Sequence, residues 1–412
     1  MTEAASTEGI VEDHLILDNV RLANPHELYR VLRAQRPVVR VTVPSGIRAW
    51  LVTRHQDVRA ALADPRLAKD SASIIRRLEH HTDPSRYPAV AKSYAEHMLN
   101  SDPPDHTRLR RLVGRAFTPR GIAQYRPRIE QIAGELLDAV AAEAASTGGM
   151  VDLLDSFAFP LPITVITELL GVPLDRRDEF REWSNASLSS DPAAPRRYAA
   201  MAAYLQDLID DKRRHPGPDM LSTFVAASED ADRLSDREAV AMVFLLLIAG
   251  HETTVNLIGN GVLALLRHPE QMAALRADPS LAPQAVEEFL RYDGPINMAT
   301  LRYTTEPVVF SGTTIPAGEV IFVALASANR DVAQYPDADR LDIRREAGNL
   351  AFGHGLHYCL GAPLARLEGE IAFNSLLARF PHLELARAPA ELSWRSGTLI
   401  RGLTELPIRI GR

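Results

Sequence analysis

The sequence predicts a mainly α-helical fold with a small β lobe. Five segments carry apolar residues at three- and four-residue spacing, the period of a helix with one buried face: residues 128–145, 197–214, 238–267, 282–292 and 364–379. Strand-like stretches are fewer and short, at residues 38–43, 49–53, 308–310 and 320–324, with Gly- and Pro-containing turns between them. No linker, repeat or low-complexity tract divides the chain, so we expect residues 1–412 to form a single domain.

Composition is that of an ordinary globular protein and disfavours several partners. The 412 residues are 46% hydrophobic and 24% charged, with a formal net charge of -7. Because the Lys and Arg residues are dispersed along an acidic chain, we expect no nucleic-acid partner. A single cysteine excludes an internal disulfide framework and indicates a reducing cytoplasm.

Neither a signal peptide nor a membrane span is expected. Residues 1–12 are polar and acidic, without the basic start and apolar stretch of a signal peptide. The longest apolar run, residues 239–249, is much shorter than the ~20 residues that cross a bilayer. We therefore expect a cytoplasmic protein that acts as a monomer, with this run buried in its core.

The segment at residues 71–104 is predicted to be irregular, with histidines at 80 and 81 and prolines at 84 and 88. Long loops of this kind often serve as lids or binding loops, and a solvated surface excursion has the same pattern. The segment alone does not separate these two roles.

The only cysteine, Cys359, lies where a glycine-rich loop enters a helix. Glycines at 353, 355 and 361 let the backbone pass close to a flat or bulky group and adopt positive φ, and Pro363 suits the first turn of a helix. A lone cysteine is most often a buried bystander. Unpaired N–H groups at a helix start, however, favour a thiolate over a thiol. The pattern therefore indicates a metal or haem ligand.

Two other uses of these residues remain open. His354, His357 and Cys359 are close enough in sequence to be zinc ligands, and Cys359 is also a possible nucleophile paired with a histidine. A structural zinc site ordinarily takes further ligands from a second Cys or His motif, and the chain has no other cysteine. Both uses are therefore less favoured than a haem ligand.

The pattern Phe-x-x-Gly-x-x-x-Cys-x-Gly, formed by Phe352, Gly355, Cys359 and Gly361, resembles the haem-binding loop of the cytochrome P-450 family. The resemblance covers nearly the whole chain and is closest to soluble bacterial members that oxidise macrolides, steroid-like molecules and other bulky natural products. It implies heme b with Cys359 as the axial thiolate ligand of the iron. It also implies the cytochrome P-450 fold, with a long central helix over the haem, and a monooxygenase that uses dioxygen.

That long helix is itself predicted by the sequence. Ser235 and Glu238 match a capping box, and the helix extends to about His268, roughly 50 Å at 1.5 Å per residue. The apolar run is followed by the polar stretch Gly-His-Glu-Thr-Thr at residues 250–254. Such a stretch is typical of a solvated patch or a hydroxyl-induced kink, and it also fits a local bulge over a cofactor.

The stretch is similar to the oxygen-binding helix of cytochromes P-450. By that likeness, Glu252 and Thr253 are the acid-alcohol pair that passes protons to dioxygen at the haem. Ala249 and Gly250 are small enough to leave room for dioxygen and substrate.

Two further sets of charged residues take roles from the same resemblance. The two haem propionates call for cationic or donor groups, and the residues suggested for them are His106, Arg110, Arg302 and His357. His106 and Arg110, four residues apart, share one helical face. The second set is the family's Glu-x-x-Arg, which is met by Glu288 and Arg291, with Arg340 as the partner arginine. Three buried charges need one another, so their role is to hold the loop that leads to Cys359.

Electrons are expected to come from a separate protein. No Gly-x-Gly-x-x-Gly follows a predicted strand, and Gly259-Asn260-Gly261 lies inside the long helix, so the chain has no evident flavin or nicotinamide module. We expect a ferredoxin and its reductase as partners, with docking on the cysteine side. Positive charge for this contact is offered by Arg108, Arg111, Arg115 and Arg366.

The expected substrate is a large apolar small molecule. By family analogy, the pocket lining includes Ile74, Ile75, Val243, Phe244, Leu247, residues 297–300 and residues 398–400. Asn100, Asn297 and Thr300 offer hydrogen bonds, and no acidic residue is clearly placed for an amino sugar. The alternative is a haem protein that uses peroxide or only binds a ligand. Retention of Glu252 and Thr253 argues against it, since a passive binder needs no proton relay.

Overall fold

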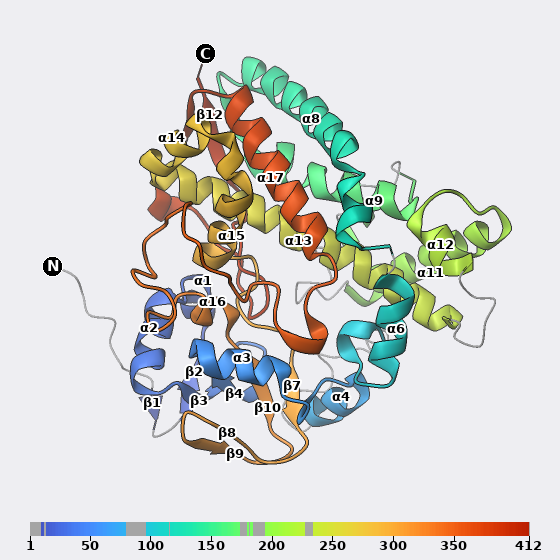
Figure 1. Cartoon of the computed structure of the whole chain (residues 1–412), viewed down its shortest axis with the longest axis vertical. Coiled ribbons are helices and arrows are strands. Elements are labelled where there is room, and N and C mark those ends of the chain that lie inside the picture. The colour runs from blue at the N-terminus through green and yellow to red at the C-terminus, as the bar shows by residue number, and fades with distance from the viewer. Residues whose placement is uncertain are drawn as a thin grey trace.

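Helices dominate the computed structural model, which describes residues 10–11, 14–79, 96–114, 116–173, 179–180, 182–183, 194–226 and 234–411. The longest, α13 (Asp236–Arg267), runs through the middle of the molecule, with a small sheet lobe to one side of it (Figure 1). The other helices are α1 (Asn19–Ala23), α2 (His26–Gln35), α3 (His55–Ala63), α4 (Ser71–Glu79), α6 (Asp105–Gly114), α7 (Pro119–Ala123), α8 (Arg126–Ser146), α9 (Pro160–Leu170), α11 (Ala194–Arg214), α12 (Met220–Ala226), α14 (Pro269–Ala277), α15 (Ala282–Asp293), α16 (Leu325–Ala328) and α17 (Ala362–Arg379).

All five predicted helices are confirmed, as α8, α11, α13, α15 and α17. Helix α9 is absent from the prediction for a physical reason. Apart from Glu168, all of its residues from Pro160 to Leu170 are buried, so no polar face reveals a helical period. The beginning of the segment predicted to be irregular forms α4, and residues 80–95, which include its two histidines, lie outside the described residues.

The start of α13 is set by the predicted capping box. The Ser235 hydroxyl accepts from the Glu238 N–H over 3.2 Å, and the Glu238 carboxylate accepts from the Ser235 N–H over 2.8 Å. Further along, Gly261 allows α17 to approach closely, since a Cβ there would lie 2.4 Å from the Phe373 ring. The glycines at 259 and 261 are therefore packing residues within a helix, as expected, and not a nucleotide-binding turn.

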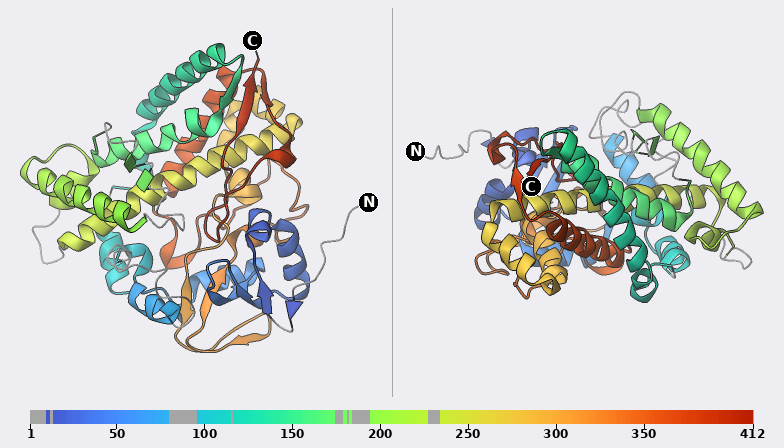
Figure 2. Two further views of the ribbon diagram at one scale, coloured as in Figure 1. Left: turned by 180° about the vertical axis from the view of Figure 1, so that it is seen from behind. Right: turned by 90° about the horizontal axis from the view of Figure 1, so that it is seen from above.

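The strands form a seven-stranded sheet of order β1-β2-β3-β4-β10-β7-β5, a three-stranded sheet of order β11-β12-β6 and a separate β8-β9 hairpin. Their bounds are β1 (Ile10–Val11), β2 (His14–Ile16), β3 (Val38–Thr42), β4 (Arg48–Val52), β5 (Leu67–Ala68), β6 (Met150–Asp152), β7 (Arg302–Thr304), β8 (Val308–Phe310), β9 (Thr313–Ile315), β10 (Val320–Val323), β11 (Leu383–Leu385) and β12 (Pro407–Ile410). The four predicted strands correspond to β3, β4, β8 and β10. Figure 2 shows the small C-terminal sheet near the end of α13 that lies away from α11 and α12.

The core has separate helical and sheet parts. Helix α13 packs against α9, α11, α15 and α17 within one large apolar cluster. It is long and apolar enough to cross a bilayer, but 72% of its most apolar window is buried inside the protein, as in a core helix. In the sheet lobe, alternate residues of β10 face opposite sides, with Val320 and Phe322 in one cluster and Ile321 and Val323 in the other. The candidate site lies where the helical body and the sheet lobe meet.

Candidate active site

The loop before α17 is folded back on itself so that Cys359 faces a cavity. The Cys359 N–H donates to the Phe352 carbonyl over 2.9 Å. Gly353 and Gly355 have φ of 74° and 72°, as predicted, and Gly355 lies tightly against Ala63 of α3. The prediction of positive φ is wrong for Gly361, which has φ of -80°. A Cβ there would lie 4.0 Å from the Cys359 sulfur, which is an ordinary contact, so sterics alone do not require glycine at this position.

The electrostatics of the Cys359 thiol combine two opposing effects. Burial within the protein is the larger effect and raises the pKa of the thiol. The backbone N–H groups of Gly361 and Ala362 lower it, as do the guanidinium groups of Arg110 and Arg366. The donors that the sequence predicts are therefore present and favour the thiolate. A metal cation bound at the sulfur would favour it further.

A cavity of about 1370 Å³, part of it open to solvent, separates the cysteine loop from α13. Cys359 is exposed to this space, and Ala249, Gly250, Thr253 and Thr254 line it from α13. Much of the remaining lining is apolar, including Met98, Leu99, Leu245, Leu246, Ile296 and Leu399. Its described lining residues include no Asp or Glu.

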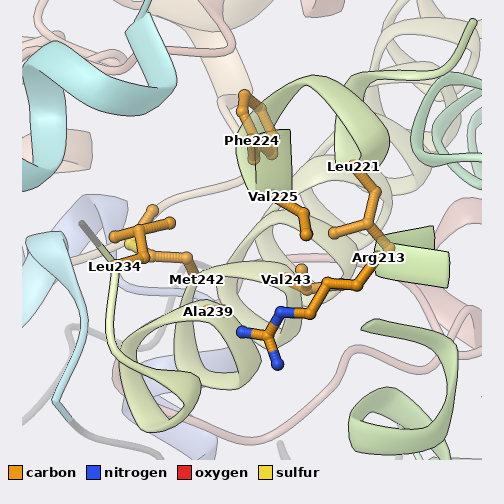
Figure 3. A pocket seen from close by; sticks show the side chains of 8 residues that line it. All are labelled: Arg213, Leu221, Phe224, Val225, Leu234, Ala239, Met242 and Val243. Atoms are coloured by element: carbon orange, nitrogen blue, oxygen red, sulfur yellow. The ribbon is translucent and has the colours of Figure 1, made fainter. Parts of the chain in front are cut away.

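Several predicted lining residues lie elsewhere. Val243 instead lines a small, narrow pocket between α11, α12 and α13, whose one charged lining residue among those described is Arg213 (Figure 3). Asn297 is fully buried and accepts a hydrogen bond from the Tyr29 hydroxyl over 2.9 Å. Ile74 and Leu247 belong to the apolar core. The predicted lining residues of α13 do not line the main cavity. The helix turns a neighbouring face toward it, and Leu245 and Leu246 lie on that face.

The polar stretch of α13 stays helical, so the local bulge considered from the sequence is not present. The Thr253 hydroxyl faces the cavity and donates to the Ala249 carbonyl over 2.9 Å. Gly250 lies against α9, where a Cβ would come within 3.1 Å of Ile166, so its small size is also required by packing.

Glu252 is buried and is not part of the cavity lining. Its Oε2 lies 3.2 Å from Arg395 Nη1, and His251 Nε2 lies 3.9 Å from its Oε1. The predicted acid and alcohol are thus adjacent in sequence but point to different surroundings. Arg395, which lies far along the chain, was not found from the sequence.

The four predicted propionate-binding residues meet on one wall of the cavity. His106, Arg110, Arg302 and His357 all line it, and the two histidine rings lie 4.3 Å apart. Burial lowers the pKa of His106 to about 4 and that of His357 to about 2, the latter with help from the nearby cation Lys69. Both rings are therefore neutral donors at neutral pH.

The hydrogen-bond donors of this wall test whether a haem fits the cavity. Among the described residues, neither ring nitrogen of His106 and not the Nε of Arg302 has a hydrogen-bond partner. Arg110 donates to the Tyr358 carbonyl over 2.7 Å. Buried donors without partners are costly unless a ligand accepts from them. The wall, the cysteine and the large cavity fit a flat group with two carboxylates and a thiolate-binding metal.

Lys69 also lines this wall and was missed by the sequence analysis. It is 1% exposed, and its Nζ donates to Thr300 Oγ1 over 2.7 Å. Nothing in the motif patterns points to it, because a lone lysine after a short strand has no distinctive spacing.

A second buried acid lies behind α13. Glu368 of α17 is fully buried, and neither carboxyl oxygen makes a well-formed hydrogen bond within the described residues. Burial raises its pKa well above the ordinary value, and the nearby Thr254 hydroxyl offsets this only in part. Burial therefore favours the protonated, neutral form of this side chain.

The Glu-x-x-Arg prediction is confirmed for its pair and wrong for its partner. Arg291 Nε donates to Glu288 over 2.7 Å, with both side chains buried. The second cation on Glu288 is Arg345, at 3.3 Å, whereas Arg340 is exposed and contributes only its backbone carbonyl to Arg291. The loop folds so that Arg345 turns inward and the Arg340 side chain points to solvent.

The zinc alternative does not agree with the geometry. Within the ranges that the structure describes, no three His, Cys, Asp or Glu side chains gather as metal ligands, so His354, His357 and Cys359 form no zinc site.

Of the arginines expected to dock a redox protein, Arg108 is paired with Glu238 and Arg366 with Glu287. Arg115 lies outside the described residues.

Comparison with known proteins agrees with this geometry. A family model described as cytochrome P450 matches residues 196–394. Cytochrome P450 107B1 of Saccharopolyspora erythraea is 51% identical over 409 residues, which is 98% of this chain and 100% of the relative. Vitamin D(3) 25-hydroxylase of Pseudonocardia autotrophica is 49% identical over 413 residues, which is 99% of each. The structure of the tirandamycin C-bound P450 monooxygenase TamI has a TM-score of 0.89 at 50% identity and covers 96% of this chain and 100% of that one.

Proposed function

This chain belongs to the cytochrome P450 family and is a haem-dependent monooxygenase, and we propose that it hydroxylates or epoxidises a bulky, mainly apolar natural product such as a macrolide or a steroid-like compound. The observation that carries the proposal is the cavity. It extends from Cys359 and the basic wall to α13, and much of its lining is apolar, which suits a cofactor beside an apolar substrate. Relatives named for vitamin D(3) hydroxylation and for bound tirandamycin C support a large substrate.

In the proposed mechanism, Cys359 binds the haem iron, because it is the only cysteine in the chain and faces the cavity. When bound, the haem supplies the reductive activation of dioxygen from which one oxygen atom enters a C–H bond. His106, Arg110, Arg302 and His357 would hold the two carboxylates of the haem through hydrogen bonds and charge.

The proton steps are assigned to α13. Thr253 Oγ1 holds a proton at the cavity face, and Ala249 accepts a hydrogen bond from it in the resting state. Glu252 is the acid that resupplies this proton. Because its carboxylate is paired with Arg395 outside the cavity lining, it must turn from Arg395 or act through water.

Electrons are proposed to come from a ferredoxin and its reductase, and the protein is proposed to act as a cytoplasmic monomer. The predicted docking arginines Arg108 and Arg366 are already paired with acids, so their contribution to a positive surface is smaller than the sequence indicates.

The substrate proposal is tested by screening natural products against the haem-loaded protein. A bound substrate displaces the iron-bound water, which shifts the haem absorption band. We expect macrolides and steroid-like compounds to give this shift and, with a ferredoxin system and NADPH, products that have gained one oxygen atom. Tightest binding by small charged molecules would reject the substrate class. Oxidation supported by peroxide but not by NADPH would reject the monooxygenase mechanism.

A further inference from the structure

Lys69 is a buried amine that none of the assignments above uses. Its position follows β5, at the edge of the seven-stranded sheet, and its ammonium reaches the basic wall of the cavity. Within the part of the chain that the structure describes, Thr300 Oγ1 is its one hydrogen-bond partner, and no carboxylate forms an ion pair with it. Since an ammonium group has three N–H donors, two of them remain for another acceptor.

The surroundings of Lys69 are unfavourable for a cation in the absence of an anion. Burial and the neighbouring Arg302 guanidinium hold the pKa of Lys69 well below its ordinary value, and the Asp102 carboxylate offsets this only in part. A buried charge persists when it is paired and hydrogen-bonded. A carboxylate bound between Lys69 and Arg302 would offset both unfavourable effects.

Asp102 fixes the position of Lys69 relative to the other residues of the wall. The Asp102 side chain accepts from the Lys69 N–H over 2.8 Å and from the Asp70 N–H over 3.0 Å. The Asp102 carbonyl accepts from the His106 N–H over 3.0 Å, at the start of α6. Asp102 therefore ties the backbone of Lys69 to the helix that carries His106 and Arg110.

The basic side chains of the wall are Lys69, Arg110 and Arg302, and they lie beside the two histidines. Two carboxylates bound there would accept from these side chains and from the ring of His106, whose nitrogens have no partner among the described residues. We propose, on the basis of the function proposed above, that Lys69 is a further cofactor-binding residue whose ammonium binds a haem carboxylate and that Thr300 positions it.

The first test measures haem binding without turnover. In holoprotein carrying Lys69→Met, we expect haem transfer to excess apomyoglobin to be at least about ten times faster than in the wild type. The midpoint potential should fall, because loss of a nearby cation favours the ferric state. Thr300→Val, which keeps the amine but removes its hydrogen bond, should give a smaller change in the same direction. Arg48→Met removes an exposed cation and is the matched control, with no change expected.

The second test identifies the carboxylate. Haem dimethyl ester, which lacks free carboxylates, should bind less tightly than haem to the wild type, and this difference should shrink in Lys69→Met. A substrate carboxylate is the other source. It would be indicated if Lys69→Met leaves haem release and potential unchanged but weakens binding of myristic acid relative to its methyl ester, and that outcome overturns the proposal.

Unchanged haem release, potential and ester discrimination would also overturn the proposal. If Lys69→Met does not fold, Thr300→Val decides, and a wild-type haem release rate and potential in that variant reject the role. Failure of the proposed function is distinguishable, since it would appear in the wild type as an absence of NADPH-supported oxygenation.

Discussion

Arg395 Nη1 lies 3.2 Å from Glu252 Oε2, so the acid of α13 is held by a residue of the C-terminal segment. Glu252 is buried and Arg395 is partly exposed, with 30% of its side chain accessible. The ion pair keeps the carboxylate outside the cavity lining while Thr253, the next residue, faces the cavity. Arg395 is therefore expected to act on the reaction through Glu252.

Replacing Arg395 by Met should slow turnover roughly tenfold, less than the ~10²–10⁴-fold that an acid-base group contributes, because Glu252 itself remains. The substrate-induced shift of the haem band should remain, because Arg395 does not line the cavity. Glu252→Gln should slow turnover at the same step, and the double variant should be no slower than Glu252→Gln alone. Turnover in H₂O and D₂O would be compared for all three. Multiplicative losses would show that Arg395 acts independently of Glu252.

Thr253→Ala should keep haem, the substrate-induced spectral change and NADPH consumption. Reducing equivalents should be diverted to hydrogen peroxide, because the hydroxyl at the cavity face is lost. Product per NADPH and released peroxide would be measured together, with Thr253→Ser as the control that retains a hydroxyl. Unchanged coupling in Thr253→Ala would mean that this hydroxyl serves only its bond to Ala249.

Cys359→Ser should abolish the thiolate-type carbon monoxide spectrum of the reduced protein. A serine hydroxyl is a far poorer electron donor to iron than a thiolate. The measurement is the absorption spectrum with and without carbon monoxide. A variant that retained the wild-type spectrum would contradict the ligand assignment.

Arg345→Leu should lower the free energy of unfolding by about 2 kcal/mol, because it removes a bond to the buried Glu288 carboxylate. Arg340→Ala should change it by less than about 0.5 kcal/mol, since the exposed Arg340 contributes only a backbone carbonyl. Urea denaturation of both haem-loaded variants measures the difference. If Arg340→Ala were the more destabilising variant, Arg340 and not Arg345 would be the partner of Glu288.

Glu368→Gln should stabilise the protein increasingly as the pH rises above the ordinary pKa of a glutamate. The raised pKa of buried Glu368 means that the native state retains a proton that the unfolded chain releases, so wild-type stability falls over this range. The difference in unfolding free energy between Glu368→Gln and the wild type should grow by at most about 1.4 kcal/mol per pH unit until the raised pKa is reached. This pH-dependent difference should vanish below the ordinary pKa of a glutamate. Denaturation midpoints of both proteins across pH measure it. A constant difference would show that Glu368 does not titrate in this way.

Residues whose place follows from a local sequence motif were predictable, whereas residues positioned by contacts with distant parts of the chain were not. Cys359 and Thr253 occur in continuous patterns that a single loop or helix face explains, so sequence sufficed to place them at the cavity. Arg345 and Arg340 both lie in one short loop, and only its folded path decides which side chain meets Glu288. Lys69 and Arg395 acquire their partners from distant parts of the chain, Thr300 and Glu252, for which spacing along the sequence carries no information.

The fold shows the same division. Helices α8, α11, α13, α15 and α17 were predictable because each combines buried and exposed faces, whereas α9 is buried almost all round. Short strands such as β5 and β7 have too few residues for an alternating pattern, and their pairing depends on chain segments far apart.

The strand order of the main sheet also determines when this protein can finish folding during its synthesis. Strand β4 ends at Val52, but its parallel neighbour β10 begins only at Val320. At ~5–20 residues per second, the first strands leave the ribosome on the order of tens of seconds before their partner exists. The N-terminal hairpin thus has an unpaired edge throughout the synthesis of the helical body, and newly made chains are most exposed to chaperones and to aggregation during that interval.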